Sequence, residues 1–87
     1  MASIRDMREE QIRMIRLRVV VDLTVYRLGH HVFSRGGALA LIERTRDEVL
    51  AIFPDKGVVF ELVLRPRFMR ILDERARMEW GVADAVN

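Results

Sequence analysis

The stretch IRLRVVVDLTVY, residues 15–26, is compatible with two different folds. Its odd-numbered positions are all aliphatic and its even-numbered positions are mostly polar, which is the period-two pattern of a strand with one buried face. Placed on a helix at about 100° per residue, the same residues form two apolar stripes on nearly opposite sides. A helix of this kind must be covered by two separate surfaces.

The residues around this stretch favour the helix. Ser3 and Asp6 have a spacing similar to a capping box, and after them no glycine, proline or asparagine occurs before Gly29. A strand would require the chain to leave a helix without a turn residue. In the helix, Thr24 lies in a polar seam between the stripes. The first stripe contains Ile12, Ile15, Val19, Leu23, Tyr26 and Phe33, and the second contains Met14, Leu17, Val21, Val25, Leu28 and Val32.

The middle of the chain, ALALIERTRDEVLAIF at residues 38–53, predicts an amphipathic helix. SRGG at residues 34–37 is interpreted as a helix stop and turn. Pro54 marks the end of the helix, and Asp55 can serve as the N-cap of the next element. The predicted apolar side consists of Leu39, Ile42, Arg46, Val49 and Phe53.

The last segment, GVVFELVLRPRFMRILDERARMEW at residues 57–80, repeats the ambiguity. Residues 58–65 alternate as a strand would, whereas a helix places Phe60, Leu64, Phe68 and Ile71 on one face, with Leu72 adjoining. Pro66 can end a strand or occupy the first turn of a helix. Trp80 is expected to pin the last helix to the core. We predict an all-α fold with a long N-terminal helix and a shorter helical hairpin; the alternative is α+β, with strands at about 15–26 and 58–65.

The composition indicates one small domain, residues 1–87, with a frayed tail at 81–87. Of the 87 residues, 51% are hydrophobic and none is cysteine, so neither a disulfide nor a thiolate metal site can stabilise the chain. A single core of this size is only marginally stable. Self-association is therefore an early hypothesis.

The charge pattern is arginine-rich but nearly balanced, with a formal net charge of +2 and Lys56 as the single lysine. This balance is a weak argument for nucleic acid. Arg16, Arg18, Asp22 and Arg27 interrupt the longest apolar stretches, and the N-terminal residues lack the apolar run of a signal peptide. We expect a cytoplasmic protein with no membrane partner.

Catalytic and metal-binding patterns are weak. His30 and His31 diverge by about 100° on a helix and have no carboxylate three or four residues away, so a metal site is not expected. Most carboxylates have arginine neighbours at helical spacing, as Asp73 has in Arg70 and Arg77, which is typical of solvated faces. We expect neither an enzyme nor a cofactor, and no small-molecule substrate is indicated.

The functional prediction is a protein–protein interaction or adaptor domain, either a homodimer or a small subunit of a complex. It follows from the two-sided helix, because one stripe left in water would promote aggregation. The predicted interface is Met14, Leu17, Val21, Val25 and Leu28, or the opposite stripe. The alternative is a small basic nucleic-acid-binding regulator that contacts phosphates through Arg65, Arg67 and Arg70.

Overall fold

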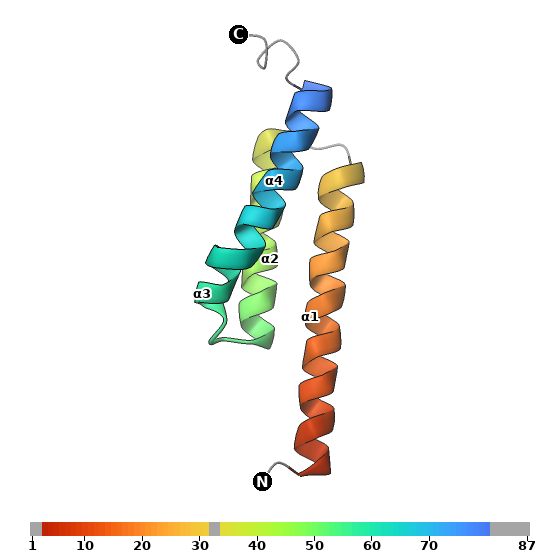
Figure 1. Ribbon diagram of the computed structural model, residues 1–87, viewed down its shortest axis with the longest axis vertical. Coiled ribbons are helices and arrows are strands. Elements are labelled where there is room, and N and C mark those ends of the chain that lie inside the picture. The colour runs from red at the N-terminus through yellow and green to blue at the C-terminus, as the bar shows by residue number, and fades with distance from the viewer. Residues whose placement is uncertain (1–2, 32–33, 81–87) are drawn as a thin grey trace.

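The protein folds into a long helix packed against a helical hairpin (Figure 1). The computed structural model describes residues 3–31 and 34–80, without the side chains of residues 79 and 80. The long helix is α1 (Ile4–His30), and the first arm of the hairpin is α2 (Arg35–Ile52). The second arm is one continuous helix, which we call the third helix; its parts are α3 (Gly57–Val59), η1 (Phe60–Leu64), α4 (Arg65–Arg75) and η2 (Ala76–Trp80).

The described residues contain no strand, so the all-α prediction is confirmed and the α+β alternative is wrong. The predictions that Trp80 joins the core and that residues 81–87 fray concern side chains and residues outside this description. None of the described helices combines the length and the apolar character needed to cross a bilayer.

Helix α1 begins with the predicted capping box. The Ser3 hydroxyl accepts a hydrogen bond from the Asp6 amide at 3.1 Å, and the Asp6 carboxylate accepts one from the Ser3 amide at 3.3 Å. The helix then continues through the β-branched residues 19–21 without a break. Val20 and Val21 contribute to the core, and this packing outweighs their lower helix propensity.

Helix α2 begins earlier than predicted. Ser34 is its N-cap, with the hydroxyl accepting a hydrogen bond from the Gly37 amide at 3.0 Å, so residues 35–37 form the first turn and not a loop. The helix ends at Ile52, before Pro54, as predicted. The N-cap predicted at Asp55 is wrong, because the third helix starts one residue later, after Lys56, and has no side-chain cap.

The core lies where the three helices meet. The prediction for the third helix is confirmed: Phe60, Phe68 and Leu72 are fully buried, and Leu64 and Ile71 pack against them. The buried face of α2 differs from the predicted one: Leu39 is exposed, and Leu41 is buried. Among the described residues, the fully buried apolar side chains are Leu28, Ala38, Ile42, Val49, Phe60, Phe68 and Leu72.

Pro66 lies inside the third helix. Its ring nitrogen carries no hydrogen and cannot donate to the carbonyl four residues earlier, at Leu62, and its ring crowds that carbonyl. The turn before it widens into the π-helical segment η1, in which the Arg65 amide donates to the Phe60 carbonyl five residues earlier. The helix accommodates the proline without ending.

Candidate protein-interaction surface

The second stripe of α1 faces the hairpin. Val21 and Leu28 are buried in the core, and Leu17 and Val25 pack against it, while Met14 stays half exposed at the edge. Because Val21 and Leu28 are buried, they cannot bind a partner, so the predicted interface at Met14, Leu17, Val21, Val25 and Leu28 is not one exposed surface. The reason is that α2 and α4 both pack on this side of α1.

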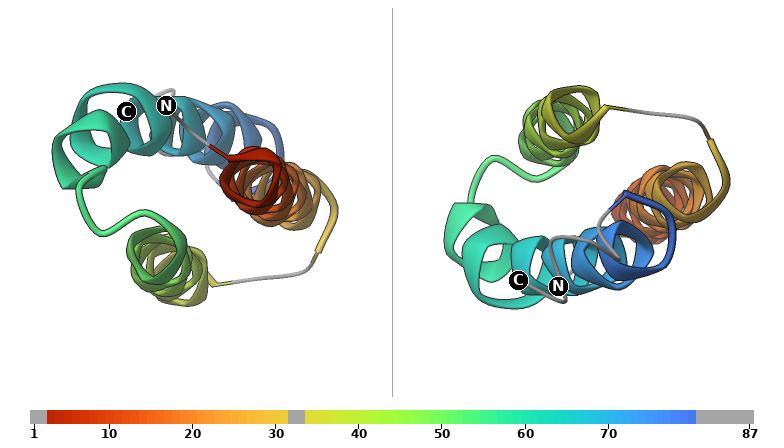
Figure 2. Two further views of the ribbon diagram at one scale, coloured as in Figure 1. Left: turned by 90° about the horizontal axis from the view of Figure 1, so that it is seen from below. Right: turned by 90° about the horizontal axis from the view of Figure 1, so that it is seen from above.

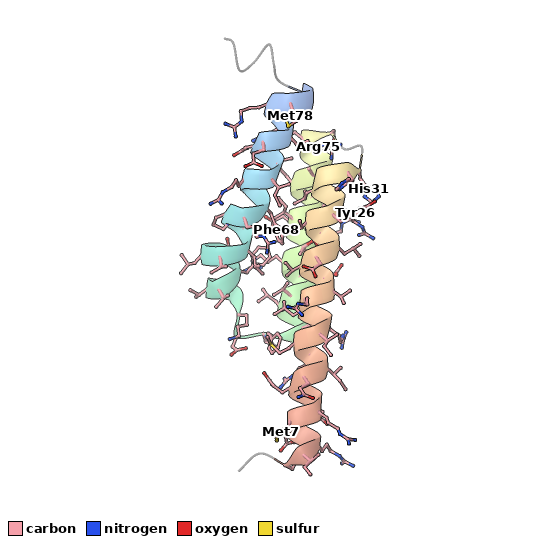
Figure 3. All side chains as sticks on the ribbon, turned by 45° about the vertical axis from the view of Figure 1, so that its right-hand side comes forward. Met7, Tyr26, His31, Phe68, Arg75 and Met78 are labelled. Carbon is pink, nitrogen blue, oxygen red and sulfur yellow. The ribbon has the colours of Figure 1, made fainter. Side chains whose placement is uncertain are left out.

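The opposite stripe is free on the outside of the molecule. We call Ile12, Ile15, Val19, Leu23 and Tyr26 the outer stripe; their exposed fractions are 56%, 61%, 56%, 43% and 55%. Phe33, which continues the pattern, lies outside the described residues. Figure 2 shows that the side of α1 turned away from the hairpin faces no other helix. Figure 3 shows Tyr26 on this outer side of α1.

Charged residues lie on both edges of the outer stripe. At helical spacing, Arg18 and Asp22 lie along one edge, and Glu9, Arg16 and Arg27 lie along the other. The hollow beside the first edge is lined by Arg18 and Asp22 of α1 and by Arg67 of α4. An apolar centre with a charged border is the layout of a protein interface, whose centre is depleted of charge and whose rim is polar.

The rings of both histidines contact the Tyr26 ring. The His30 ring stacks on the Tyr26 ring with centroids 4.4 Å apart, and its Nδ1 lies 3.0 Å from the Tyr26 carbonyl oxygen. The His31 ring meets the Tyr26 ring edge-on, with centroids 6.1 Å apart. Within residues 3–31 and 34–80, no group of three or more histidine or acidic side chains could hold a metal ion.

The three arginines of the predicted nucleic-acid contact have different environments in the structure. Arg65 donates hydrogen bonds to Glu61 and Glu43, both at 2.6 Å, and its guanidinium lies over the Phe60 ring, 5.4 Å from the centroid. It therefore serves the hairpin and is not free to bind a phosphate, which corrects its predicted role. Arg67 and Arg70 are exposed, and neither forms an ion pair within the part of the chain that the structure describes.

The Arg65 network changes the acidity of its partners. The hydrogen bond from Arg65 lowers the pKa of Glu61 below its ordinary value, and a second bond from Arg46 at 3.0 Å adds to this effect. The pKa of Glu43 is lowered in the same way by Arg65. These ion pairs connect α2 to the third helix at the surface.

Two buried polar contacts were not found from the sequence. Thr24, predicted to lie in a polar seam, is buried against Thr45 of α2, with the hydroxyl oxygens 2.9 Å apart. Arg75 is also buried, and it donates to the Leu28 carbonyl at 2.9 Å, which is one of the last carbonyls of α1. Figure 3 shows Arg75 between the upper ends of α4 and α1. Neither pair has a local sequence signal, because its members are 21 and 47 residues apart.

Comparison of the chain with protein-family models, with curated proteins and with solved structures found no match.

Proposed function

We propose that the chain is a protein–protein interaction domain that assembles with a helix of another protein chain through the outer stripe of α1. The observation that supports this proposal is the exposure of five apolar side chains on one side of a single helix. Their spacing of three and four residues matches the way in which a docked helix presents anchors. Scattered exposed apolar residues need no explanation, but a continuous stripe with a charged border does.

The outer stripe contributes little to the fold of the protomer. Phe68 and Leu72 are fully buried, whereas each side chain of the outer stripe keeps about half of its surface in water. Replacing these residues with polar ones should therefore leave folding intact and remove only the contact with a partner. This separation makes the proposal testable by mutation.

The test compares the purified wild-type chain with an Ile15→Lys/Val19→Lys variant. We expect light scattering after size-exclusion chromatography to give a wild-type mass that rises above the 10.2 kDa of one chain with increasing concentration. The variant should stay at 10.2 kDa with an unchanged circular dichroism spectrum. The matched control is Glu48→Lys, on an exposed position of α2, which should associate as the wild type does.

Two results would contradict this proposal. One is a wild-type chain that remains monomeric at high micromolar concentration. The other is association that persists unchanged in the Ile15→Lys/Val19→Lys variant, because another surface would then be responsible. The exposed residues Val58, Val59, Leu62 and Val63 on the third helix would be the next surface to test.

Nucleic-acid binding is the second candidate function. It is supported by the exposed pair Arg67 and Arg70, with Arg77 lining the same hollow as Arg70. If it is correct, binding to a short duplex weakens steeply as salt rises, and an Arg67→Ala/Arg70→Ala variant binds more weakly without unfolding. A wild-type chain that fails to retard duplex or single-stranded DNA at low salt would eliminate this candidate.

A further inference from the structure

We propose that the occupant of the outer stripe is a second copy of this chain, packed antiparallel to the first about a two-fold axis at Val19. This inference depends on the proposed function and names its partner. Three features of α1 carry the argument: the spacing of the apolar side chains, the order of the charges beside them and the free space around them.

The spacing of the outer stripe is the same in both directions. From Ile12 to Tyr26 the successive gaps are three, four, four and three residues, with Val19 at the centre. If two copies run antiparallel with Val19 facing Val19, Ile12 of one copy faces Tyr26 of the other, and Ile15 faces Leu23. Every apolar side chain of the stripe then meets an apolar side chain. An isologous two-fold contact needs this kind of self-complementary surface.

The charges on the first edge fit the same arrangement. In an antiparallel pair with its two-fold axis normal to the plane of the helices, each edge meets the same edge of the other copy. Arg18 then lies within about two residues, or about 3 Å along the axis, of Asp22 from the second copy. The two arginines of this edge sit together at the centre, and one aspartate flanks each of them. Arg67 of α4 lines the same hollow as Arg18 and Asp22, so this edge keeps a positive charge overall while the two Arg18–Asp22 pairs connect the copies.

The second edge is complementary as well. Glu9 of one copy lies about 3 Å along the axis from Arg27 of the other, and the symmetry repeats this pair at the far end of the interface. A parallel pair is less favourable, because opposite edges then meet and Arg16 comes beside Arg18 of the second copy. The antiparallel pair also brings the two Arg18 side chains together, but it adds two Arg18–Asp22 and two Glu9–Arg27 pairs, whereas the parallel pair brings no opposite charges of these edges within two residues. The charge order therefore favours the antiparallel arrangement.

The hairpin leaves room for the second copy. Since α2 and α4 pack on the side of α1 that carries Val21 and Leu28, the outer stripe has no other helix in front of it (Figure 2). With Val19 on the axis, the two α1 helices overlap from Arg8 to His30, over about 34 Å. One helix face is smaller than a standard interface of about 800 Å² per partner, so we expect a reversible dimer with a micromolar dissociation constant.

Cysteine cross-linking tests the orientation, because the chain has no cysteine of its own. An Ile12→Cys chain and a Tyr26→Cys chain are mixed in a glutathione redox buffer, and the cross-linked products are identified by mass. The antiparallel dimer predicts mainly the mixed product, whereas a parallel dimer predicts each variant linked to itself. A Glu48→Cys chain, with its cysteine on α2, reports the background of random collision.

Charge reversal supplies an independent measurement. Arg18→Asp should weaken dimerisation roughly tenfold, because it replaces attraction with repulsion on both sides of the axis. Arg18→Asp/Asp22→Arg should restore it, while Arg44→Asp, on an exposed position of α2, should leave it unchanged. Circular dichroism confirms that each variant folds. Mainly mixed cross-links together with this restoration would support the proposal.

The outcomes separate this inference from the proposed function. Self-linked products, a failure of the double charge reversal to restore dimerisation, or a mass of three or more chains would overturn the antiparallel dimer and leave an interaction domain. A wild-type chain that remains monomeric at high micromolar concentration would overturn both.

Discussion

The contact between Thr24 and Thr45 illustrates how individual residues determine the packing of α1 on α2. Each hydroxyl also lies near a carbonyl of its own helix: Thr24 is 2.8 Å from the Val20 oxygen, and Thr45 is 2.9 Å from the Leu41 oxygen. Two hydroxyls carry two hydrogens, but these contacts together with the 2.9 Å contact between the hydroxyls number three. At any instant one contact has no hydrogen to share.

Because two hydrogens serve three contacts, we expect the losses of stability from replacing Thr24 and Thr45 to be non-additive. Thr24→Val should cost less than about 1 kcal/mol, because Thr45 keeps the Leu41 carbonyl as its acceptor. Thr45→Val should lower the free energy of unfolding by a similar amount. The double variant Thr24→Val/Thr45→Val should lower it no more than the more destabilising single variant, because no buried hydroxyl then remains. Urea unfolding of the three variants measures these energies. A double variant that loses the sum of two large single effects would contradict the argument.

Arg75 is a second residue that connects α1 to the hairpin, here through α4. The last carbonyls of a helix have no partner inside the helix, and Leu28 is among the last residues of α1. The guanidinium of Arg75 reaches the Leu28 carbonyl from α4 and places a positive charge near the negative end of the α1 dipole. One side chain thus connects the end of α4 to the end of α1.

At the scale of the element, the sequence predicted a two-sided α1 but not which side is buried. Both stripes are equally apolar, so the choice depends on the residues between them. Thr24 and Val20 lie beside the stripe that carries Val21 and Leu28 and add no charge to it, whereas Arg16 and Asp22 border the outer stripe. The part of the helix surface without charged side chains is therefore wider on the side of Val21 and Leu28. This difference was present in the sequence, and it could have placed Val21 and Leu28 in the core.

The other elements show which local signals are sufficient. Pro54 predicted the end of α2 because a proline restricts the residue before it. Ser34 was missed as an N-cap because the glycines after it suggested a turn, although Gly36 and Gly37 lie in a first turn whose amides lack intrahelical partners. Pro66 was predicted either to end a strand or to occupy the first turn of a helix, and it lies inside the third helix, directly after a π-helical turn.

At the scale of the whole molecule, the protein is elongated, with dimensions of 58 × 22 × 15 Å. The lower end of α1 projects past the hairpin in Figure 1, and the side chains of residues 4–16 are exposed. A sequence can predict that such a helix has a second apolar face. It cannot identify what covers that face, because the complementary surface belongs to another molecule or depends on how two copies align.

The hairpin itself should weaken in acid. The hydrogen bonds from Arg65 hold the pKa values of Glu43 and Glu61 below their ordinary values in the folded chain. A carboxylate with a lowered pKa adds stability above its unfolded pKa, and this stability is lost as the pH falls through the folded pKa. We expect the urea midpoint to fall when the pH is lowered from neutral to about 3, below the ordinary range of glutamate.

Two glutamine substitutions, which keep the size and shape of glutamate, isolate the contribution of the carboxylate charges to stability. Glu43→Gln/Glu61→Gln should be less stable than its parent at neutral pH, and the two midpoints should converge in acid, where the glutamates are also uncharged. The measurement uses the Ile15→Lys/Val19→Lys background, so that association does not add to the apparent stability. Glu48→Gln is the control, because Glu48 is exposed and belongs to none of the ion pairs between α2 and the third helix within the described residues. A gap that stays constant with pH would mean that these carboxylates act through packing and not through their charge.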